Sequence, residues 1–326
     1  MQRTDLLSCL RRFGSHSLAY STVQPLMNWY GIDDIGYVAF RRLGHYTFVL
    51  GDPVADPARV VELLDRFHGE HDRPCYVHIG QVTSKLLAER GYRCNSMGVE
   101  SWINLHAFNP TWGSHNALRE SERRFAKLDI RVVEASLDRL GQFGITREDI
   151  TAVSDRWLSA RPQGRELRFL VRPLVVTEEP GVRRFFLLHN DRLVGYVCYD
   201  PVYRDNRIEG YCPNIARFDD RDLPTGRSVL VNLEAARRFA RENIPYLALG
   251  LSPLAGDLRS PFADRVWLRG LFRLGRRLSL GFEFDGLTRH KSYWKGETTP
   301  VYYASGRRGP DALLELRALA RLVNLY

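Results

Sequence analysis

Gly36-Tyr-Val-Ala-Phe-Arg-Arg-Leu-Gly-His-Tyr-Thr-Phe-Val-Leu50 is the stretch of the chain that decides its fold. Both arms, 36–41 and 45–50, are rich in apolar and aromatic residues, and the glycine between them predicts a β-hairpin. Working outward, apolar residues at helical spacing over 57–69 predict a helix, and Cys75-Tyr-Val-His-Ile79 predicts a short buried strand. A hairpin, a helix and a buried strand in this order indicate an α+β unit with a mixed sheet.

The second half of the chain shows the same order of elements. Strands are predicted at 184–189, 193–199, 207–212 and 246–250, and a helix at 227–243. No repeat is visible at the level of residues, so the two halves share only their element order. That order resembles the acetyltransferase-like (GNAT) fold. We therefore expect an α+β fold of two tandem GNAT-like domains, residues 1–115 and 116–326, with mixed sheets flanked by helices.

Composition narrows the function classes. Of the 326 residues, 47 are Lys or Arg and 38 are Asp or Glu, and this formal net charge of +9 favours polyanionic partners such as nucleic acid or an anionic membrane surface. No stretch approaches 18 consecutive apolar residues, so we expect no transmembrane segment. The five cysteines show no CxxC spacing, which indicates reduced thiols and a cytoplasmic protein. No motif of metal ligands is present in the sequence, so we expect no metal.

A series of short motifs runs through the chain. They are Phe48-Val-Leu-Gly-Asp-Pro-Val54, Glu122-Arg-Arg-Phe-Ala-Lys-Leu128, Asn214-Ile-Ala-Arg217, Leu249-Gly-Leu-Ser-Pro-Leu-Ala255 and Lys291-Ser-Tyr-Trp294. In order and spacing, the set resembles the C-terminal cytoplasmic domain of phosphatidylglycerol lysyltransferases and related aminoacyl-tRNA-dependent transferases. The resemblance implies two tandem GNAT-like domains. It also implies transfer of an aminoacyl group from aminoacyl-tRNA to a hydroxyl or amine acceptor.

The implied reaction begins with attack of the acceptor on the aminoacyl ester and ends with release of the ribose oxygen. The ester is already activated, so no cofactor is expected. Lys291 is the predicted catalytic residue, which stabilises the oxyanion or protonates the leaving oxygen. His290 is a candidate general base, because the usual pKa of histidine lies near neutral. Both residues lie in a Gly- and Thr-rich tail, where we expect side chains outside the core.

Eight residues are candidates for substrate binding. They are Asn214, Arg217, Glu209, Ser252, Asp257, Arg259, Tyr293 and Trp294. Arg217 suits a phosphate at the tRNA end, with a structural salt bridge as the alternative. Asn214 and Glu209 are candidates for binding the amino group, and Ser252, Asp257 and Arg259 for lining the pocket. Tyr293 and Trp294 are candidates for stacking on the terminal adenine, with core packing as the alternative.

Basic residues at helical spacing are candidate tRNA contacts. They are Arg119 and Arg123 on one predicted helix, and Arg265, Arg269, Arg273 and Arg276 on another, with Lys295 in the tail. A spacing of three or four residues places side chains on one side of a helix, where they face either a phosphate backbone or water. We expect tRNA or another anionic partner to bind along the arginine-rich stretch 265–277.

Some positions depart from the family pattern, so the amino acid and the acceptor stay open. Tyr293 replaces the second lysine of the family, and Asn214 replaces an acidic residue. The acceptor is then a lipid headgroup, a peptide or a small molecule, and peripheral contact with the inner membrane face is an option. One alternative is an acyl-coenzyme A-dependent N-acyltransferase, which Asp222 and Pro224 disfavour at the turn where a pyrophosphate binds. Another is a tRNA- or anionic-surface-binding protein whose catalytic site has decayed.

Overall fold

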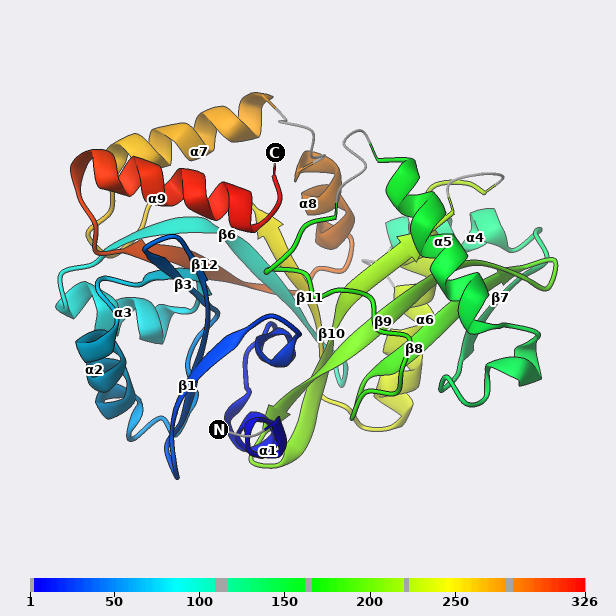
Figure 1. The fold of residues 1–326 in the computed structure, drawn as a ribbon. Coiled ribbons are helices and arrows are strands. Elements are labelled where there is room, and N and C mark those ends of the chain that lie inside the picture. The colour runs from blue at the N-terminus through cyan, green and yellow to red at the C-terminus, as the bar shows by residue number, and fades with distance from the viewer. Residues whose placement is uncertain (1–2, 109–115, 162–165, 220–222, 279–283, 326) are drawn as a thin grey trace.

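Among the described residues, twelve strands form one mixed sheet, which organises the fold (Figure 1). The computed structural model describes residues 3–108, 116–161, 166–219, 223–278 and 284–325. The strand order is β1-β2-β3-β5-β12-β6-β11-β10-β9-β8-β7, and β4 pairs with β2. The strands are β1 (Asn28–Ile32), β2 (Gly36–Leu43), β3 (Tyr46–Leu50), β4 (Val54–Ala55), β5 (Cys75–Ile79), β6 (Arg93–Asn104), β7 (Ile130–Glu134), β8 (Arg183–His189), β9 (Arg192–Arg204), β10 (Arg207–Phe218), β11 (Tyr246–Pro253) and β12 (Glu297–Ser305).

Helices cover both faces of this sheet. They are α1 (Arg3–Phe13), α2 (Val60–Glu70), α3 (Gln81–Glu89), α4 (Asn116–Phe125), α5 (Arg147–Ser159), α6 (Arg227–Arg241), α7 (Val266–Leu278), α8 (Phe284–Ser292) and α9 (Gly309–Leu322). Apolar residues of α1, α5 and α9 share one core. Those of α2 and α3 form a second core, and those of α4 and α6 a third.

The predicted hairpin forms as β2 and β3, with Phe40 opposite Val49 and Leu43 opposite Tyr46. Its alternating residues reach opposite faces of the sheet, as the pleat of a strand requires. Phe48 packs in the core with α1 and α9, and Val49 packs in the core with α2 and α3. The expected α+β class, a mixed sheet flanked by helices, is confirmed.

The last strand of the chain lies inside the first half of the sheet. β12 pairs antiparallel with β5, where Tyr303 lies opposite Val77, and with β6, where Pro300 lies opposite Val99. In addition, α9 contacts β3, and α7 contacts β6. The chain therefore crosses back over the expected boundary at 115/116, which adjoins residues outside the described part. The division into 1–115 and 116–326 stays a prediction.

The N-terminal helix α1 joins the two halves. It contacts β2 and β4 on one side and β9 and β10 on the other, and Figure 1 shows it between these strands. Leu6 and Leu10 of this helix are buried. The helix places the turn that follows it, residues 15–17, over the middle of the sheet, where Ser17 reaches β6.

Strands β10 and β11 separate part-way along their length. Over their described length they pair in parallel only between 210–211 and 246–247. Beyond this point β11 stays paired with β6, with a shift of register just before Gly250, whose φ of +69° is one that glycine adopts without strain. The separation opens the sheet near its centre, and α8 packs against β11.

Candidate active site

Lys291 lies near the C-terminal end of α8, and its side chain is buried. Its Nζ donates a hydrogen bond to the carbonyl oxygen of Leu251 on β11, 2.6 Å away. Burial lowers the pKa of Lys291 to about 8, while Cys212 and Glu100 act in the opposite direction. The expectation that this lysine lies outside the core is wrong, because the tail folds into a helix that packs against β11.

His290 precedes Lys291 on the same helix. Burial first, and then the charge of Lys291, lower the pKa of His290 to about 4. Its Nε2 is buried and has no hydrogen-bond partner among the residues that the structure describes. The imidazole is therefore neutral and has the capacity to accept a proton. Its role as a general base stays a prediction.

Asn214 lies on β10, where the register with β9 shifts between Pro213 and Ile215. Its Nδ2 donates to the hydroxyl of Ser21, 2.8 Å away. Its Oδ1 accepts a hydrogen bond from the backbone N–H of Arg172 at 3.2 Å. The amide thus ties β10 to the segment that follows α1, on the strand that borders the opening of the sheet.

Arg217 is buried at the end of β10. It forms an ion pair with Glu166, and its guanidinium carbon lies 3.8 Å from the ring centroid of Trp157. Burial lowers the pKa of Arg217 to about 10. From the sequence, the alternative is a salt bridge to Asp219, Asp220 or Asp222, and the structure pairs Arg217 with Glu166 instead. Asp219 pairs with Arg156 at 2.8 Å, and Asp220 and Asp222 lie outside the described residues. A phosphate contact by Arg217 stays a prediction.

The two aromatic residues after α8 differ in their surroundings. Trp294 is buried, and its ring stacks on Phe108 with centroids 5.5 Å apart. It belongs to the same core as α6. Tyr293 is partly buried and packs against that core. Core packing is therefore the structural role of Trp294, and stacking on adenine stays a prediction.

Of the other predicted binding residues, one is buried near Lys291 and three lie elsewhere. Ser252 is buried on β11, directly after the residue that Lys291 contacts. Asp257 and Arg259 pair with each other at 2.7 Å on an exposed loop. Glu209 lies 3.7 Å from an exposed arginine of β9. The structure brings Ser252 close to Lys291 and shows no contact between Lys291 and the other three.

The first of the four arginines predicted to contact tRNA along 265–277 has a structural role instead. Arg265 is buried before the first turn of α7, and its guanidinium donates to the carbonyl oxygens of Ser305, at 3.3 Å, and Arg307. These bonds hold the end of β12 and make Arg265 a structural residue. Arg269 is on α7 itself and pairs with Asp264 at 2.8 Å.

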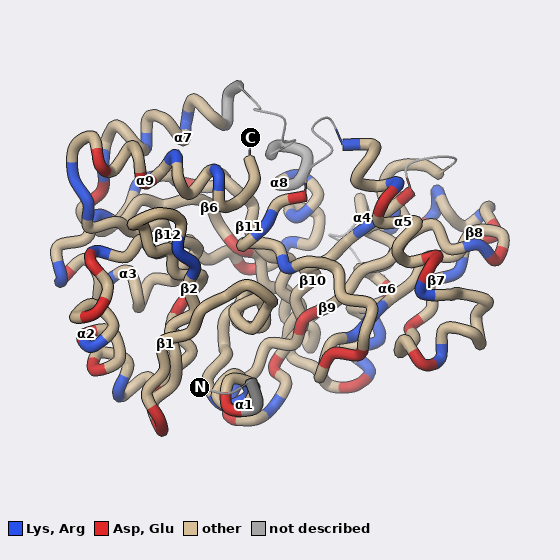
Figure 2. Tube along the Cα trace, viewed as in Figure 1, with Lys and Arg blue, Asp and Glu red and all other residues tan. Residues whose placement is uncertain are grey.

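The remaining basic candidates lie at or near the surface. Arg273 on α7, Arg123 on α4 and Lys295 after α8 are exposed, and Arg119 on α4 is partly buried. The side chain of Arg276 lies outside the described residues. Figure 2 shows basic residues spread along α7. The tRNA contacts stay a prediction for these residues.

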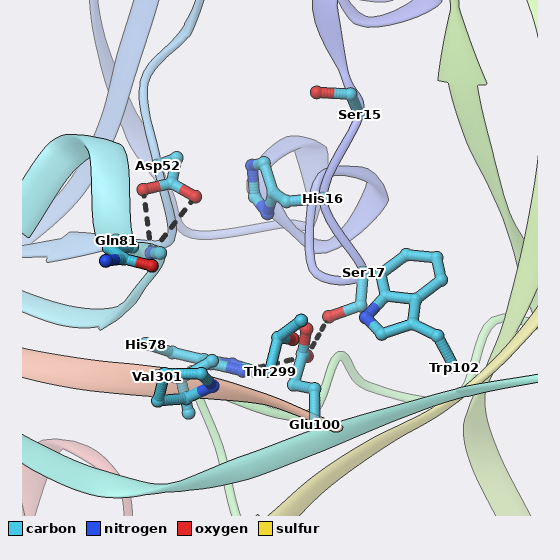
Figure 3. Close-up of a pocket in the computed structure, with 12 residues that line it drawn as sticks. Ser15, His16, Ser17, Asp52, His78, Gln81, Glu100, Trp102, Thr299 and Val301 are labelled. Atoms are coloured by element: carbon cyan, nitrogen blue, oxygen red, sulfur yellow. Dashed lines mark hydrogen bonds and ion pairs between the residues drawn. The ribbon is translucent and has the colours of Figure 1, made fainter. Parts of the chain in front are cut away.

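A cavity of about 240 Å³ lies beside β6, and none of the predicted site residues lines it. Its walls come from the turn after α1, the turn after β3, and strands β5, β6 and β12. Glu100 lies in this cavity, where it accepts a hydrogen bond from Ser17 and pairs with His78 Nε2 at 2.9 Å (Figure 3). Burial on its own raises the pKa of a carboxyl group, but His78 and Ser17 lower that of Glu100 to about 2.

Glu100 links this cavity to Lys291. It lies on β6 opposite Leu251 on one side and opposite Thr299 on the other. Leu251 supplies the carbonyl oxygen that Lys291 contacts, and Thr299 lines the cavity. The Glu100 carboxylate also acts to raise the pKa of both Lys291 and His16, another residue of the cavity. The cavity and Lys291 therefore lie close to the same residue of β6.

One signal in the sequence marks this cavity. The motif that begins at Phe48 contains Asp52, which lines the cavity. The Asp52 carboxylate accepts a hydrogen bond at 3.0 Å from the backbone N–H of Gly80, the residue before α3. The Gly-Asp-Pro turn directly after a buried strand is therefore a sequence signal for this cavity, in addition to being part of the family resemblance. The histidines and Glu100 stand singly in the sequence and carry no such signal.

Nearly the whole chain is matched by a known family. The family described as phosphatidylglycerol lysyltransferase, C-terminal, matches residues 8–305. The chain belongs to this family. Phosphatidylglycerol lysyltransferases are named for a group transfer, so this member belongs to a family of transferases.

Individual relatives agree with this assignment. The phosphatidylglycerol lysyltransferase of Bacillus subtilis (strain 168) is 22% identical over 283 residues, which are 85% of this chain and 32% of that protein. The chain thus spans about a third of that relative's length. The structure of L-PGS from Bacillus licheniformis has a TM-score of 0.79 at 18% identity, covering 100% of this chain and 97% of that one. The FemX structure has a TM-score of 0.51 at 10% identity, covering 98% of both chains.

These likenesses agree with the predicted α+β fold. Its division into two tandem GNAT-like domains stays a prediction. Within the described ranges, no helix of this lysyltransferase family member is both long and apolar enough to cross a membrane. The same ranges contain no group of three or more His, Cys, Asp or Glu side chains placed to hold a metal ion.

Proposed function

We propose that this protein transfers an aminoacyl group from aminoacyl-tRNA to a hydroxyl- or amine-bearing acceptor. The observation that carries the proposal is the buried Lys291, held against Leu251 where β10 and β11 have separated. Charges interact more strongly in a buried site than in water, so an ammonium placed there stabilises negative charge that develops on a substrate. Family membership supports a transfer reaction.

Lys291 suits both charges that form during this transfer. Negative charge develops first on the ester carbonyl oxygen and then on the departing ribose oxygen. An ammonium has three N–H donors, and one of them is directed at Leu251, so the others serve the substrate. With a pKa of about 8, Lys291 is mostly protonated at pH 7 yet releases its proton more readily than an ordinary lysine.

The separation of β10 and β11 provides the place for the aminoacyl group. A Cβ atom added at Gly250 would lie 3.8 Å from Cys212 Sγ and 4.0 Å from Lys291 Nζ. These three residues therefore lie next to one another where the strands have separated. Asn214 and Arg217 continue along β10 from Cys212 and keep their predicted roles towards the amino group and the tRNA end.

The proposed anionic partner binds at α7. Arg273 is exposed there, Arg269 is paired with Asp264, and Arg265 is buried in structural contacts. A membrane surface is a second candidate for the same helix, because Trp267, Leu271 and Leu274 are 43%, 44% and 50% exposed and share one face. An apolar face beside arginines is typical of helices that lie on anionic lipid. A peripheral place at the cytoplasmic membrane face is part of the proposal.

The test is transfer of radiolabel from each charged tRNA to a panel of lipid, peptide and small-molecule acceptors. We expect transfer that RNase abolishes and that Lys291→Met removes. Lys85→Met is the matched control, because Lys85 is exposed on α3. Transfer from an acyl-coenzyme A that RNase does not affect would establish the N-acyltransferase alternative. Binding of tRNA without transfer to any acceptor would establish the binding-protein alternative.

A further inference from the structure

His16 lines the cavity beside β6, and none of the roles above uses it. Its Nε2 is buried and has no hydrogen-bond partner within the described part of the chain. Figure 3 shows its ring between Asp52 on one side and Ser17 on the other. A buried polar atom without a partner costs about 1–3 kcal/mol, so this nitrogen is a position where a ligand would gain a hydrogen bond.

The backbone beside His16 makes room for the ring. Gly51 has a φ of +69°, and a Cβ atom there would lie 2.5 Å from His16 Cε1. Any other residue at this position would be strained and would displace the imidazole. Gly51 immediately precedes Asp52, so two adjacent residues of one motif shape the same cavity.

The charged and titratable groups that act on His16 are Asp52, Glu100 and His78. Burial is the largest influence and lowers the pKa of His16, against the two carboxylates, which raise it. The imidazole is therefore neutral at pH 7. Glu100 accepts from His78 and Ser17 and stays ionised, so it is a weak proton acceptor. His16 is the better base of the cavity.

We propose that the cavity holds the hydroxyl-bearing end of the acceptor and that His16 is the catalytic base that takes the proton from this hydroxyl. The inference rests on the proposed aminoacyl transfer. The carboxylates of Asp52 and Glu100 disfavour a phosphate inside the cavity. They also favour the protonated form of an amine, which has no lone pair for attack. A hydroxyl suits the uncharged polar groups of Ser15 and Gln81, which line the same space.

The transfer step balances with the groups present. The acceptor oxygen forms a bond to the aminoacyl carbonyl carbon, and its proton passes to His16 Nε2. The bond from that carbon to the ribose oxygen breaks, and the ribose oxygen takes a proton from Lys291. Exchange with solvent then returns His16 to its neutral form and Lys291 to its charged form. The fixed negative charge of Glu100 stabilises the imidazolium while it exists.

The experiment compares two reactions of the same aminoacyl-tRNA on the full chain. One is transfer to an alcohol, with glycerol and short-chain phosphatidylglycerol as the probes. The other is enzyme-dependent formation of the hydroxamate from hydroxylamine, a neutral nucleophile that needs no base. We expect His16→Gln to lower alcohol transfer about 100-fold or more and to change hydroxamate formation less than about threefold. The control, His45→Gln, replaces an exposed histidine and should change neither reaction.

Several results would overturn the inference. Equal loss of both reactions in His16→Gln would give this residue a structural or donor-side role, and loss of neither would remove it from the reaction. Selective loss in His290→Gln alone would make His290 the base. A wild-type protein that forms hydroxamate but aminoacylates neither alcohol would refute the hydroxyl acceptor. A wild-type protein that performs neither reaction would refute the proposed function itself.

A second variant guards against a folding defect. Gly51→Ala leaves His16 in the chain but places a Cβ atom against its ring. We expect the same selective loss of alcohol transfer, and thermal unfolding identifies any variant that does not fold. If Gly51→Ala folds and retains full alcohol transfer, the position of the His16 ring is irrelevant to catalysis and the inference is wrong.

Discussion

Glu100 lies opposite Leu251 across β6 and β11, and the Leu251 carbonyl oxygen accepts the hydrogen bond from Lys291. Glu100, whose carboxylate is buried, and the buried ammonium of Lys291 are thus both next to Leu251. β12 pairs with the other side of β6 and fixes that strand. Sheet backbone thus holds both Glu100 and the carbonyl oxygen that Lys291 contacts, and it positions functional groups more accurately than loops do.

Lys291→Ala should lower turnover by about 10²–10³, or roughly 3–4 kcal/mol, if the ammonium stabilises charge that develops only in the transition state. The affinity for tRNA should change much less. Lys291→Arg should not restore the rate, because a guanidinium does not release its proton. Single-turnover transfer at saturating aminoacyl-tRNA measures the effect. A rate within about threefold of wild type would show that another group carries the reaction.

Lys291→Met should stabilise the protein at neutral pH. Burial lowers the pKa of Lys291 from 10.5 in the unfolded chain to about 8, so folding carries a penalty that is fully present below pH 8. The penalty is at most roughly 3 kcal/mol and disappears as the pH rises from 8 to 10.5. Urea unfolding should show that the variant's gain in the free energy of unfolding is smaller at pH 10 than at pH 7. A gain that does not depend on pH would exclude this cause.

Glu100→Gln should destabilise the fold by about 3 kcal/mol at neutral pH, because it removes the buried carboxylate that accepts hydrogen bonds from His78 and Ser17. The pKa of Glu100 falls from 4.5 to about 2 on folding, so its contribution is present above pH 4.5 and is lost as the pH falls towards 2. Denaturant unfolding between pH 3 and pH 7 tests both parts. An equal loss of stability in the variant at pH 3 and at pH 7 would show that the ionised Glu100 carboxylate is not the cause.

Binding of tRNA should weaken steeply with salt, with a slope of log affinity against log salt of roughly −0.7 to −0.9 for each phosphate contact. Arg273→Ala should reduce that slope by about one contact. Arg265→Ala should instead lower the melting temperature, because Arg265 is bonded to the end of β12. Filter binding at several salt concentrations separates the two effects. An unchanged slope in Arg273→Ala would remove α7 from the tRNA surface.

Trp267→Ala combined with Leu271→Ala should weaken binding to vesicles that contain an anionic lipid and leave tRNA affinity unchanged. The two side chains are exposed and apolar, so they contribute to insertion at a lipid interface and little to contact with phosphates. Co-sedimentation with vesicles of phosphatidylglycerol and phosphatidylcholine is the measurement, with pure phosphatidylcholine as the control. Equal binding by variant and wild type would leave tRNA as the preferred partner of α7.

Strong local patterns allowed the hairpin, the helix near 60–70 and the strand 246–250 to be predicted from the sequence. Both α1 and α8 were missed, for different physical reasons. The α1 sequence is short and polar, and its stability comes from Leu6 and Leu10 packing between strands far away in the chain. The α8 sequence has weak periodicity around Gly286, and its packing against β11 is a tertiary effect.

The candidate site was predicted only where the family resemblance marks it. Lys291 and Ser252 were found in this way, and the structure places Lys291, on α8, against β11, the strand that carries Ser252. The cavity was not found, because His16, His78 and Glu100 come from three distant segments with no common spacing. Their meeting depends on β6 lying between β11 and β12, which no local pattern predicts.

The insertion of β12 between β5 and β6 has a consequence for biosynthesis. A ribosome completes β5 and β6 about 200 residues before it reaches β12, and until then both strands expose unpaired edges. Such edges are prone to pair with other chains, so we expect the nascent first half to need chaperones or slow elongation to avoid aggregation. We also expect its part of the sheet to be completed only after β12 has been synthesised, which couples the folding of distant segments of the chain.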